Sequence, residues 1–104
     1  MTPAEKNLAL LGLKVTDRVT GLEGVVTSIC FDLYGCVQAI INPGLDKDGK
    51  YFDSVYLDVG RLRVRYPGEP PVMPVPDFLS EKGPAEKPPQ ARPPLPLSPK
   101  ASAL

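Results

Sequence analysis

The distribution of proline is the feature of this sequence that most restricts its fold. Twelve of the 14 prolines in the 104-residue chain lie between Pro67 and Pro99. Proline has a fixed φ and no backbone N–H, so a segment this rich in proline cannot form a helix or a sheet and is expected to be an extended polyproline-II chain. We therefore expect an N-terminal segment (residues 1–12), a folded domain (13–66) and an extended arm (67–104). A domain of this size has a small core.

Charge and residue types exclude several classes of function. Twelve basic and twelve acidic residues give no net charge, and the charges balance both before and after Pro67, so nucleic acid is not an expected partner. The chain has no histidine, which removes Ser-His and Cys-His dyads and His-ligated metals. Two cysteines are too few for a four-ligand zinc site. We expect no enzymatic activity, no cofactor and no bound metal.

The sequence shows no secretory signal and no apolar run of membrane-spanning length. A reducing, cytoplasmic environment is therefore expected, with no membrane partner.

The first residues carry the signals of a short helix. Thr2 is a favourable N-cap residue, and Glu5 stands three positions later to complete a capping box, which predicts a helix over residues 2–11. Leu8 and Leu11 lie on one apolar stripe of that helix. This stripe is expected either to close the open end of its own domain or to dock on another chain.

Residues 13–65 alternate between short β-rich runs and turn signals, as in a small antiparallel barrel or sandwich. A single 3₁₀ turn is expected at 58–61. Alternation in the second strand would place Val25 and Ile29 on one face and Val26 on the other, whereas Ala39 and Ile41 share a face of the third. The five predicted strands cover residues 14–20, 25–31, 36–42, 51–58 and 62–65.

Two glycines mark the first hairpin, in the run DRVTGLEGVVTSI at residues 17–29. Gly21 allows a turn with positive φ, and Gly24 lets the next strand begin without a Cβ clash. The run resembles the hairpin signature of KOW-type and other SH3-like barrels. That resemblance implies a five-stranded SH3-like barrel and, for KOW domains, RNA or ribosome binding.

A longer stretch resembles small proteins commonly encoded by tailed bacteriophages and prophages. The resemblance rests on the VTGxxGxVTS run, the DLYGC turn at residues 32–36, the DKDGK loop at 46–50 and the closing DVGRL segment at 58–62. It departs from that pattern at Tyr56 and Leu57, where an aromatic pair is more usual. The resemblance implies a phage origin and brings no catalytic residues.

Three arginines are the candidates for contact with nucleic acid. Arg61, Arg63 and Arg65 alternate along the last predicted strand and would share one face. A charged edge strand that prevents aggregation is the favoured interpretation, with phosphate contact as the alternative.

Cys30 and Cys36 flank the DLYG turn. A cross-strand disulfide is conceivable, but two reduced, partly buried thiols are favoured in a cytoplasmic protein.

The arm is predicted to carry spaced apolar anchors that bind a neighbouring protein surface, because a proline-stiffened chain loses less entropy on ordering than a flexible one. The leading hypothesis is a non-enzymatic phage structural protein, such as a capsid decoration or cement component, which binds other phage subunits; copies of itself are a further candidate partner. Its expected location is the virion or the cytoplasm of the infected bacterium. The predicted partner-binding residues are Leu8, Leu11, Val72, Met73, Val75, Phe78, Leu79, Leu95 and Leu97.

Two alternatives remain open. One is a soluble binding module that acts in the host cell, as a defence inhibitor or a nucleotide sequestrant. The other is KOW-like nucleic-acid binding.

Overall fold

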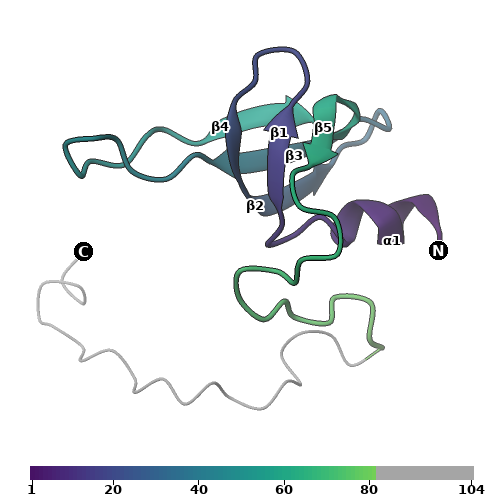
Figure 1. Cartoon of the computed structure of the whole chain (residues 1–104). Coiled ribbons are helices and arrows are strands. Elements are labelled where there is room, and N and C mark those ends of the chain that lie inside the picture. The colour runs from purple at the N-terminus through teal and green to yellow at the C-terminus, as the bar shows by residue number, and fades with distance from the viewer. Residues whose placement is uncertain (82–104) are drawn as a thin grey trace, which may run out of the picture.

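Five antiparallel strands form one sheet in the computed structural model, which describes residues 1–81 (Figure 1). The sheet order is β4-β3-β2-β1-β5, so neighbours in sequence are neighbours in the sheet until β5 returns to pair with β1. The expected mainly β fold with five strands is confirmed. A 3₁₀ helix, η1, joins β4 to β5 as predicted. The elements are β1 (Lys14–Asp17), β2 (Glu23–Phe31), β3 (Val37–Asn42), β4 (Val55–Asp58), η1 (Val59–Arg61) and β5 (Leu62–Val64).

Both glycines of the first hairpin have the predicted roles. Gly21 has φ +80°, in the left-handed region that favours glycine. A Cβ on Gly24 would lie 2.6 Å from the carbonyl oxygen of Asn42 and 2.7 Å from Cγ2 of Ile41. Strands β2 and β3 can therefore approach at this point only because position 24 has no side chain.

A β-bulge in β2 overturns the predicted division of its faces. Val26 pairs with Ile41 and Ser28 with Ile40, so Thr27 is an extra residue in the ladder. The extra residue reverses the alternation after Val26, and both Val26 and Ile29 pack into the core. The prediction that these two side chains lie on opposite faces is wrong, because strict alternation holds only in an unbroken strand.

The core lies on the inner face of the sheet and is small. Ala39 and Ile41 share the buried face of β3, as predicted. The buried apolar residues are Val15, Val26, Ala39, Ile41, Leu57 and Leu62; those packed against them are Leu10, Leu11, Leu22, Ile29, Val55 and Val59.

The N-terminal helix, α1 (Pro3–Leu8), is shorter than predicted. Its capping box is present: the Glu5 amide donates to Oγ1 of Thr2 at 3.2 Å, and the Thr2 amide donates to Oε1 of Glu5 at 3.0 Å. That second bond lowers the pKa of Glu5. No residue of α1 is buried. The turn after the helix, rather than the helix itself, packs Leu10 and Leu11 on the core.

A buried ion pair ties the end of β1 to η1. Asp17 is 1% exposed, and its carboxylate accepts hydrogen bonds from Nε and Nη2 of Arg61 at 3.0 and 2.7 Å. Oγ1 of Thr20 and the amide of Val19 also donate to it, at 2.6 and 3.2 Å. These donors, led by Arg61, hold the pKa of Asp17 far below its ordinary value. The pair therefore fixes the β1–β2 turn against the chain that enters β5.

Candidate partner-binding surfaces

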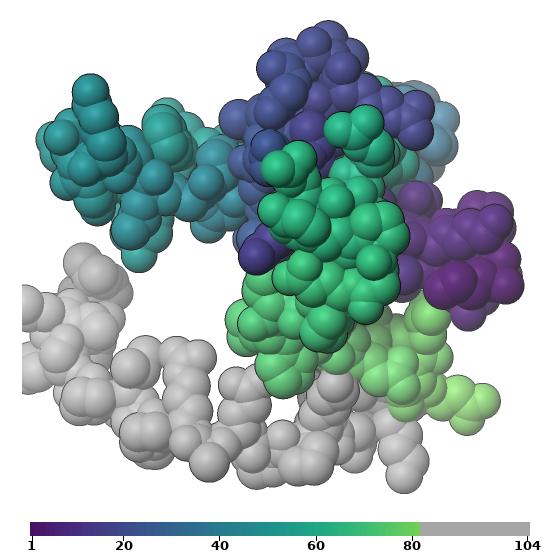
Figure 2. All heavy atoms as spheres, in the orientation of Figure 1, coloured from purple at the N-terminus to yellow at the C-terminus, as the bar shows by residue number. Residues whose placement is uncertain are grey.

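The first part of the arm, residues 67–81, folds back onto its own domain. After β5 the chain turns at Gly68, which has φ +87°. It then runs beside Gly12, whose carbonyl accepts a hydrogen bond from the Val72 amide at 2.9 Å. The amide of Gly12 itself donates to the carbonyl of Val26 at 2.8 Å. Figure 2 shows the first part of the arm, residues 67–81, in light green beneath the sheet and next to the helix. Gly12 thus connects β2 to the arm through its two backbone hydrogen bonds.

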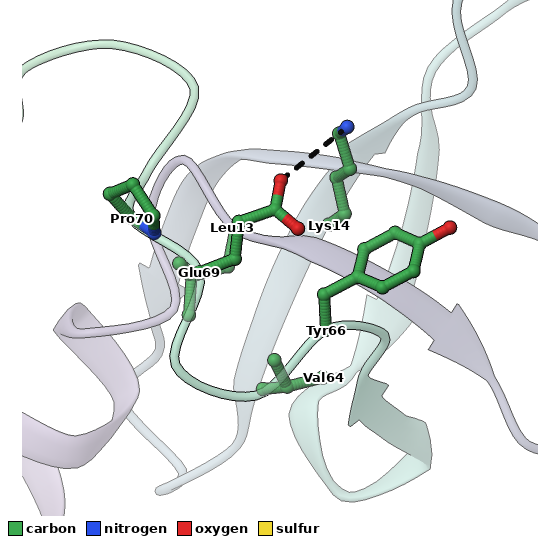
Figure 3. Close-up of a pocket in the computed structure, with 6 residues that line it drawn as sticks. All are labelled: Leu13, Lys14, Val64, Tyr66, Glu69 and Pro70. Atoms are coloured by element: carbon green, nitrogen blue, oxygen red, sulfur yellow. Dashed lines mark ion pairs between the residues drawn. The ribbon is translucent and has the colours of Figure 1, made fainter.

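A small hollow at the start of the arm is a packing contact. Nζ of Lys14 lies 5.7 Å from the centroid of the Tyr66 ring, and Figure 3 shows these two side chains. Cζ of Arg65 lies 5.3 Å from the same centroid. Lys14 also pairs with Glu69 across 3.7 Å. The hollow measures about 10 Å³, which is room for at most one water molecule. These residues hold the arm in place and leave no space for a ligand.

A larger apolar groove lies between the end of the N-terminal segment, the start of β2 and the arm. We call it the arm–helix groove; its volume is about 270 Å³. Pockets that enclose small molecules measure roughly 300–1,000 Å³, so the volume of this groove is close to the lower end of that range. It is lined by Leu11, Gly12, Val25, Val26, Thr27, Val72, Met73, Pro74, Val75, Pro76 and Phe78.

A second hollow of about 210 Å³ adjoins the groove on the side of α1. The two share Val75, Pro76 and Phe78. Two carboxylates, those of Glu5 and Asp77, stand at this second hollow. The apolar surface therefore ends at a border that carries these two carboxylates and the N-terminal residue, Met1.

The structure gathers the predicted partner-binding residues of its described part at these two hollows. Leu8 and Leu79 line the second, and the other five line the groove. The exposed fractions of Val72, Met73, Phe78 and Leu79 run from 47% to 59%. The described anchors of the arm thus form the wall of a groove on their own domain, and their binding to a neighbouring protein stays a prediction. Leu95 and Leu97 lie outside the described residues.

Replacing Gly12 by alanine is expected to release the arm. Gly12 has φ +80°, and an added Cβ would lie 2.8 Å from Cβ of Pro71. The variant should be cleaved by a protease between residues 67 and 81 at least tenfold faster than the wild-type protein. Gly68→Ala, which is also strained at positive φ but has open space around it, is the control. Equal cleavage of the two variants would contradict a docking role for Gly12.

Two turns expose large apolar side chains that the sequence analysis did not select. In the β3–β4 connection, at the left of Figure 1, Leu45 and Tyr51 form an isolated bridge and are 56% and 82% exposed; Phe52 is 51% exposed. In the β2–β3 turn, Leu33 and Tyr34 are 90% and 86% exposed. We call these five the hairpin-end residues.

The aspartates of these turns hold their backbones in place. Oδ1 of Asp46 accepts from the amides of Asp48 and Lys50 at 2.8 and 2.9 Å. Oδ1 of Asp32 accepts from the amides of Tyr34 and Cys36 at 2.9 and 2.7 Å. The signal that could have revealed these sites is a large apolar residue beside an Asp-initiated turn, where a polar residue is usual.

Two of the three candidate arginines are paired with carboxylates. Only Arg63 belongs to β5; Arg61 lies in η1 and Arg65 follows the strand. Arg61 is bound to Asp17, and Nε of Arg65 pairs with Glu23 across 3.0 Å. The backbone pairing with β1 continues through both flanking arginines, since the carbonyl of Arg61 accepts from the Arg18 amide and the Arg65 amide donates to the carbonyl of Lys14. Contact of these arginines with nucleic acid stays a prediction.

Cys30 and Cys36 are free and both are exposed, whereas partial burial was predicted. The carboxylate of Asp32 raises the pKa of the Cys36 thiol, so that thiol is protonated near neutral pH and is a poor nucleophile.

Residues 1–81 contain no group of three His, Cys, Asp or Glu side chains placed to hold a metal ion. Over the same residues no helix is long and apolar enough to cross a membrane. Comparison of the chain with known proteins found no matching family model, no matching curated protein and no matching solved structure.

Proposed function

We propose that the protein is a non-enzymatic structural component of a tailed-phage virion, of the capsid decoration or cement type, which docks on neighbouring subunits through its hairpin-end residues. The exposure of these five large side chains, on turns fixed by aspartate, is the observation that carries the proposal. Complete burial of one such side chain contributes roughly 1.5–3 kcal/mol.

Fixed turns favour binding for a second reason. A contact surface that is already ordered loses little conformational entropy when a partner covers it. In each turn an aspartate accepts hydrogen bonds from backbone amides, so the backbone that carries the exposed side chains is already ordered before a partner binds. Aromatic side chains such as Tyr34 and Tyr51 are also enriched at interfaces.

The sheet topology and the sequence resemblance support the rest of the proposal. The return of β5 to β1 and the bend that the bulge gives to β2 agree with a small barrel of strongly bent strands. The phage origin is supported by the resemblance of the VTGxxGxVTS, DLYGC, DKDGK and DVGRL segments. Nucleic-acid binding has less support, because two of its three candidate arginines are held by carboxylates.

Joint replacement of Tyr51 and Phe52 by serine is expected to remove the protein from virions without unfolding it. Both side chains are more than half exposed, so the change in stability should be within about 0.5 kcal/mol. Virions from a strain that expresses the variant should contain at least tenfold less of it than of the wild-type protein, as measured by mass spectrometry.

Val19→Ser is the matched control, because Val19 is 71% exposed on the β1–β2 turn, away from both hairpin ends. This variant should be incorporated normally. If the wild-type protein is absent from virions but present in the infected cell, the virion proposal fails and a binding module acting in the host cell takes its place.

A further inference from the structure

The arm is electrostatically divided at the end of its described part. Residues 67–81 contain three acidic and no basic side chains, Glu69, Asp77 and Glu81. Residues 82–104 reverse this balance, with one acidic residue, Glu86, and four basic ones, Lys82, Lys87, Arg92 and Lys100. The neutral arm therefore consists of an acidic half, which lines the hollows, and a basic half.

The arm–helix groove has few polar groups for a ligand to satisfy. Among its lining residues only Thr27 has a polar side chain, and Oγ1 of Thr27 already donates to the carbonyl of Ile40 at 3.2 Å. A peptide with many free N–H groups would lose their hydration without gaining hydrogen bonds here. A segment of alternating proline and leucine avoids this cost, since proline has no N–H and polyproline II has no internal hydrogen bonds.

The chain itself contains such a segment, PPLPL at residues 93–97, next to Arg92. We propose that the arm–helix groove is a binding site for an extended proline–leucine peptide, and that residues 92–99 of the same chain occupy it. The apolar anchors would be Leu95 and Leu97. This site is distinct from the hairpin ends and does not depend on the function proposed above.

The length of the chain permits this contact. Phe78 lines both hollows, and the described residues end three positions later, at Glu81, within about 10 Å of it. Arg92 follows Glu81 by eleven residues, which span up to about 34 Å in polyproline II. The segment can therefore turn and return to the groove.

Charge favours the same arrangement. The border of the second hollow carries Glu5 and Asp77, next to the groove. A segment in the groove with Arg92 at one end would bring its guanidinium near these carboxylates, a pairing that guanidinium geometry suits. A short linker gives an effective concentration of the order of 1 mM, well above the micromolar concentrations of a purified protein. Binding within one chain is therefore favoured over binding between two copies.

The full-length variant with Leu95→Asp and Leu97→Asp tests the proposal by NMR. The amide signals of Gly12, Thr27 and Val72 should shift by more than their line widths relative to the wild-type protein. The matched control, Ala101→Asp with Ala103→Asp, adds the same charge outside the segment and should leave them in place. Unchanged signals in the first variant would overturn the proposal.

A peptide of residues 91–100 provides the second measurement. It should bind the Leu95→Asp, Leu97→Asp chain at the same three amides, and bind the wild-type chain about tenfold more weakly. A tenfold effect is expected when an intramolecular competitor at about 1 mM opposes a peptide with a Kd of about 100 μM. Equal affinity for the two chains would show that the groove is empty in the wild-type protein and would overturn the assignment.

A mixed sample of labelled and unlabelled wild-type chains separates binding within a chain from binding between chains. Contacts between the Leu95 methyls and the Phe78 ring should arise only within one chain, and the protein should sediment as a monomer. Contacts between differently labelled chains, with a dimer, would overturn the assignment in favour of a second copy. The tests use purified protein alone, so their failure is distinguishable from failure of the virion proposal.

Discussion

Replacing Asp17 by alanine is expected to lower the Tm of the protein by about 15 °C. The carboxylate is buried and accepts four hydrogen bonds, from Arg61, Thr20 and Val19. Its loss releases the β1–β2 turn and leaves the guanidinium of η1 without its partner. Thermal unfolding followed by circular dichroism measures the effect.

Asp53→Ala is the control for this variant, because Asp53 is exposed in the β3–β4 connection. Its Tm should stay within about 3 °C of the wild-type value. Equal losses in the two variants would contradict a structural role for the buried pair.

The same pair predicts a dependence of stability on pH. The pKa of Asp17 in the folded protein is far below the value of about 3.9 in an unfolded chain. Its contribution is therefore complete at pH values well above 3.9 and is lost as the pH falls below that value toward the folded-state pKa. Between about pH 5 and pH 2 the Tm of the wild-type protein should fall more steeply than that of Asp17→Ala. Parallel curves would contradict this assignment.

Replacing Gly24 by alanine is expected to cost about 3 kcal/mol of unfolding free energy, which corresponds to a Tm lower by roughly 12–24 °C. The new Cβ would lie 2.6 and 2.9 Å from the carbonyl oxygen and carbon of Asn42. These are backbone atoms within the β2–β3 pairing, so the strands themselves must separate. Urea or thermal unfolding gives the free energy directly.

Gly60→Ala is the matched control. Gly60 lies in η1, its φ is not positive, and an added Cβ there would meet no atom within 4 Å. Its stability should change by less than about 1 kcal/mol, with a small gain expected from the stiffer unfolded chain. If both alanine variants lost the same stability, close strand approach at Gly24 would not be the cause.

Local signals in the sequence predict much of this fold because they arise from neighbouring residues. The capping box needs only Thr2 and Glu5, and the first hairpin is marked by Gly21 and Gly24. The β class and the number of strands follow from runs of β-branched residues between turn residues. These features depend on contacts between residues that are close together in the sequence, so a sequence pattern can predict them.

The missed features depend on contacts between distant segments. The bulge at Thr27 is visible only in the register of β2 against β3. The pairing of Arg61 with Asp17 joins residues 44 positions apart. Likewise, the position of Val72 is set by a hydrogen bond to Gly12, which precedes the first strand in the sequence. Residues 67–81 form no helix or strand, as their composition predicts, but composition cannot show which surface these residues contact.

The attachment at Gly12 also determines how the domain would carry mechanical load. A force applied to the arm beyond Val72 would act on the Val72 amide, and through Gly12 on the carbonyl of Val26 in β2, the longest of the described strands. Tension entering there passes into the centre of the sheet and bypasses β5, the three-residue strand at its edge. Under direct load, a three-residue edge strand would lose its hydrogen bonds to β1 one after another. The contact at Gly12 carries the load before it reaches β5.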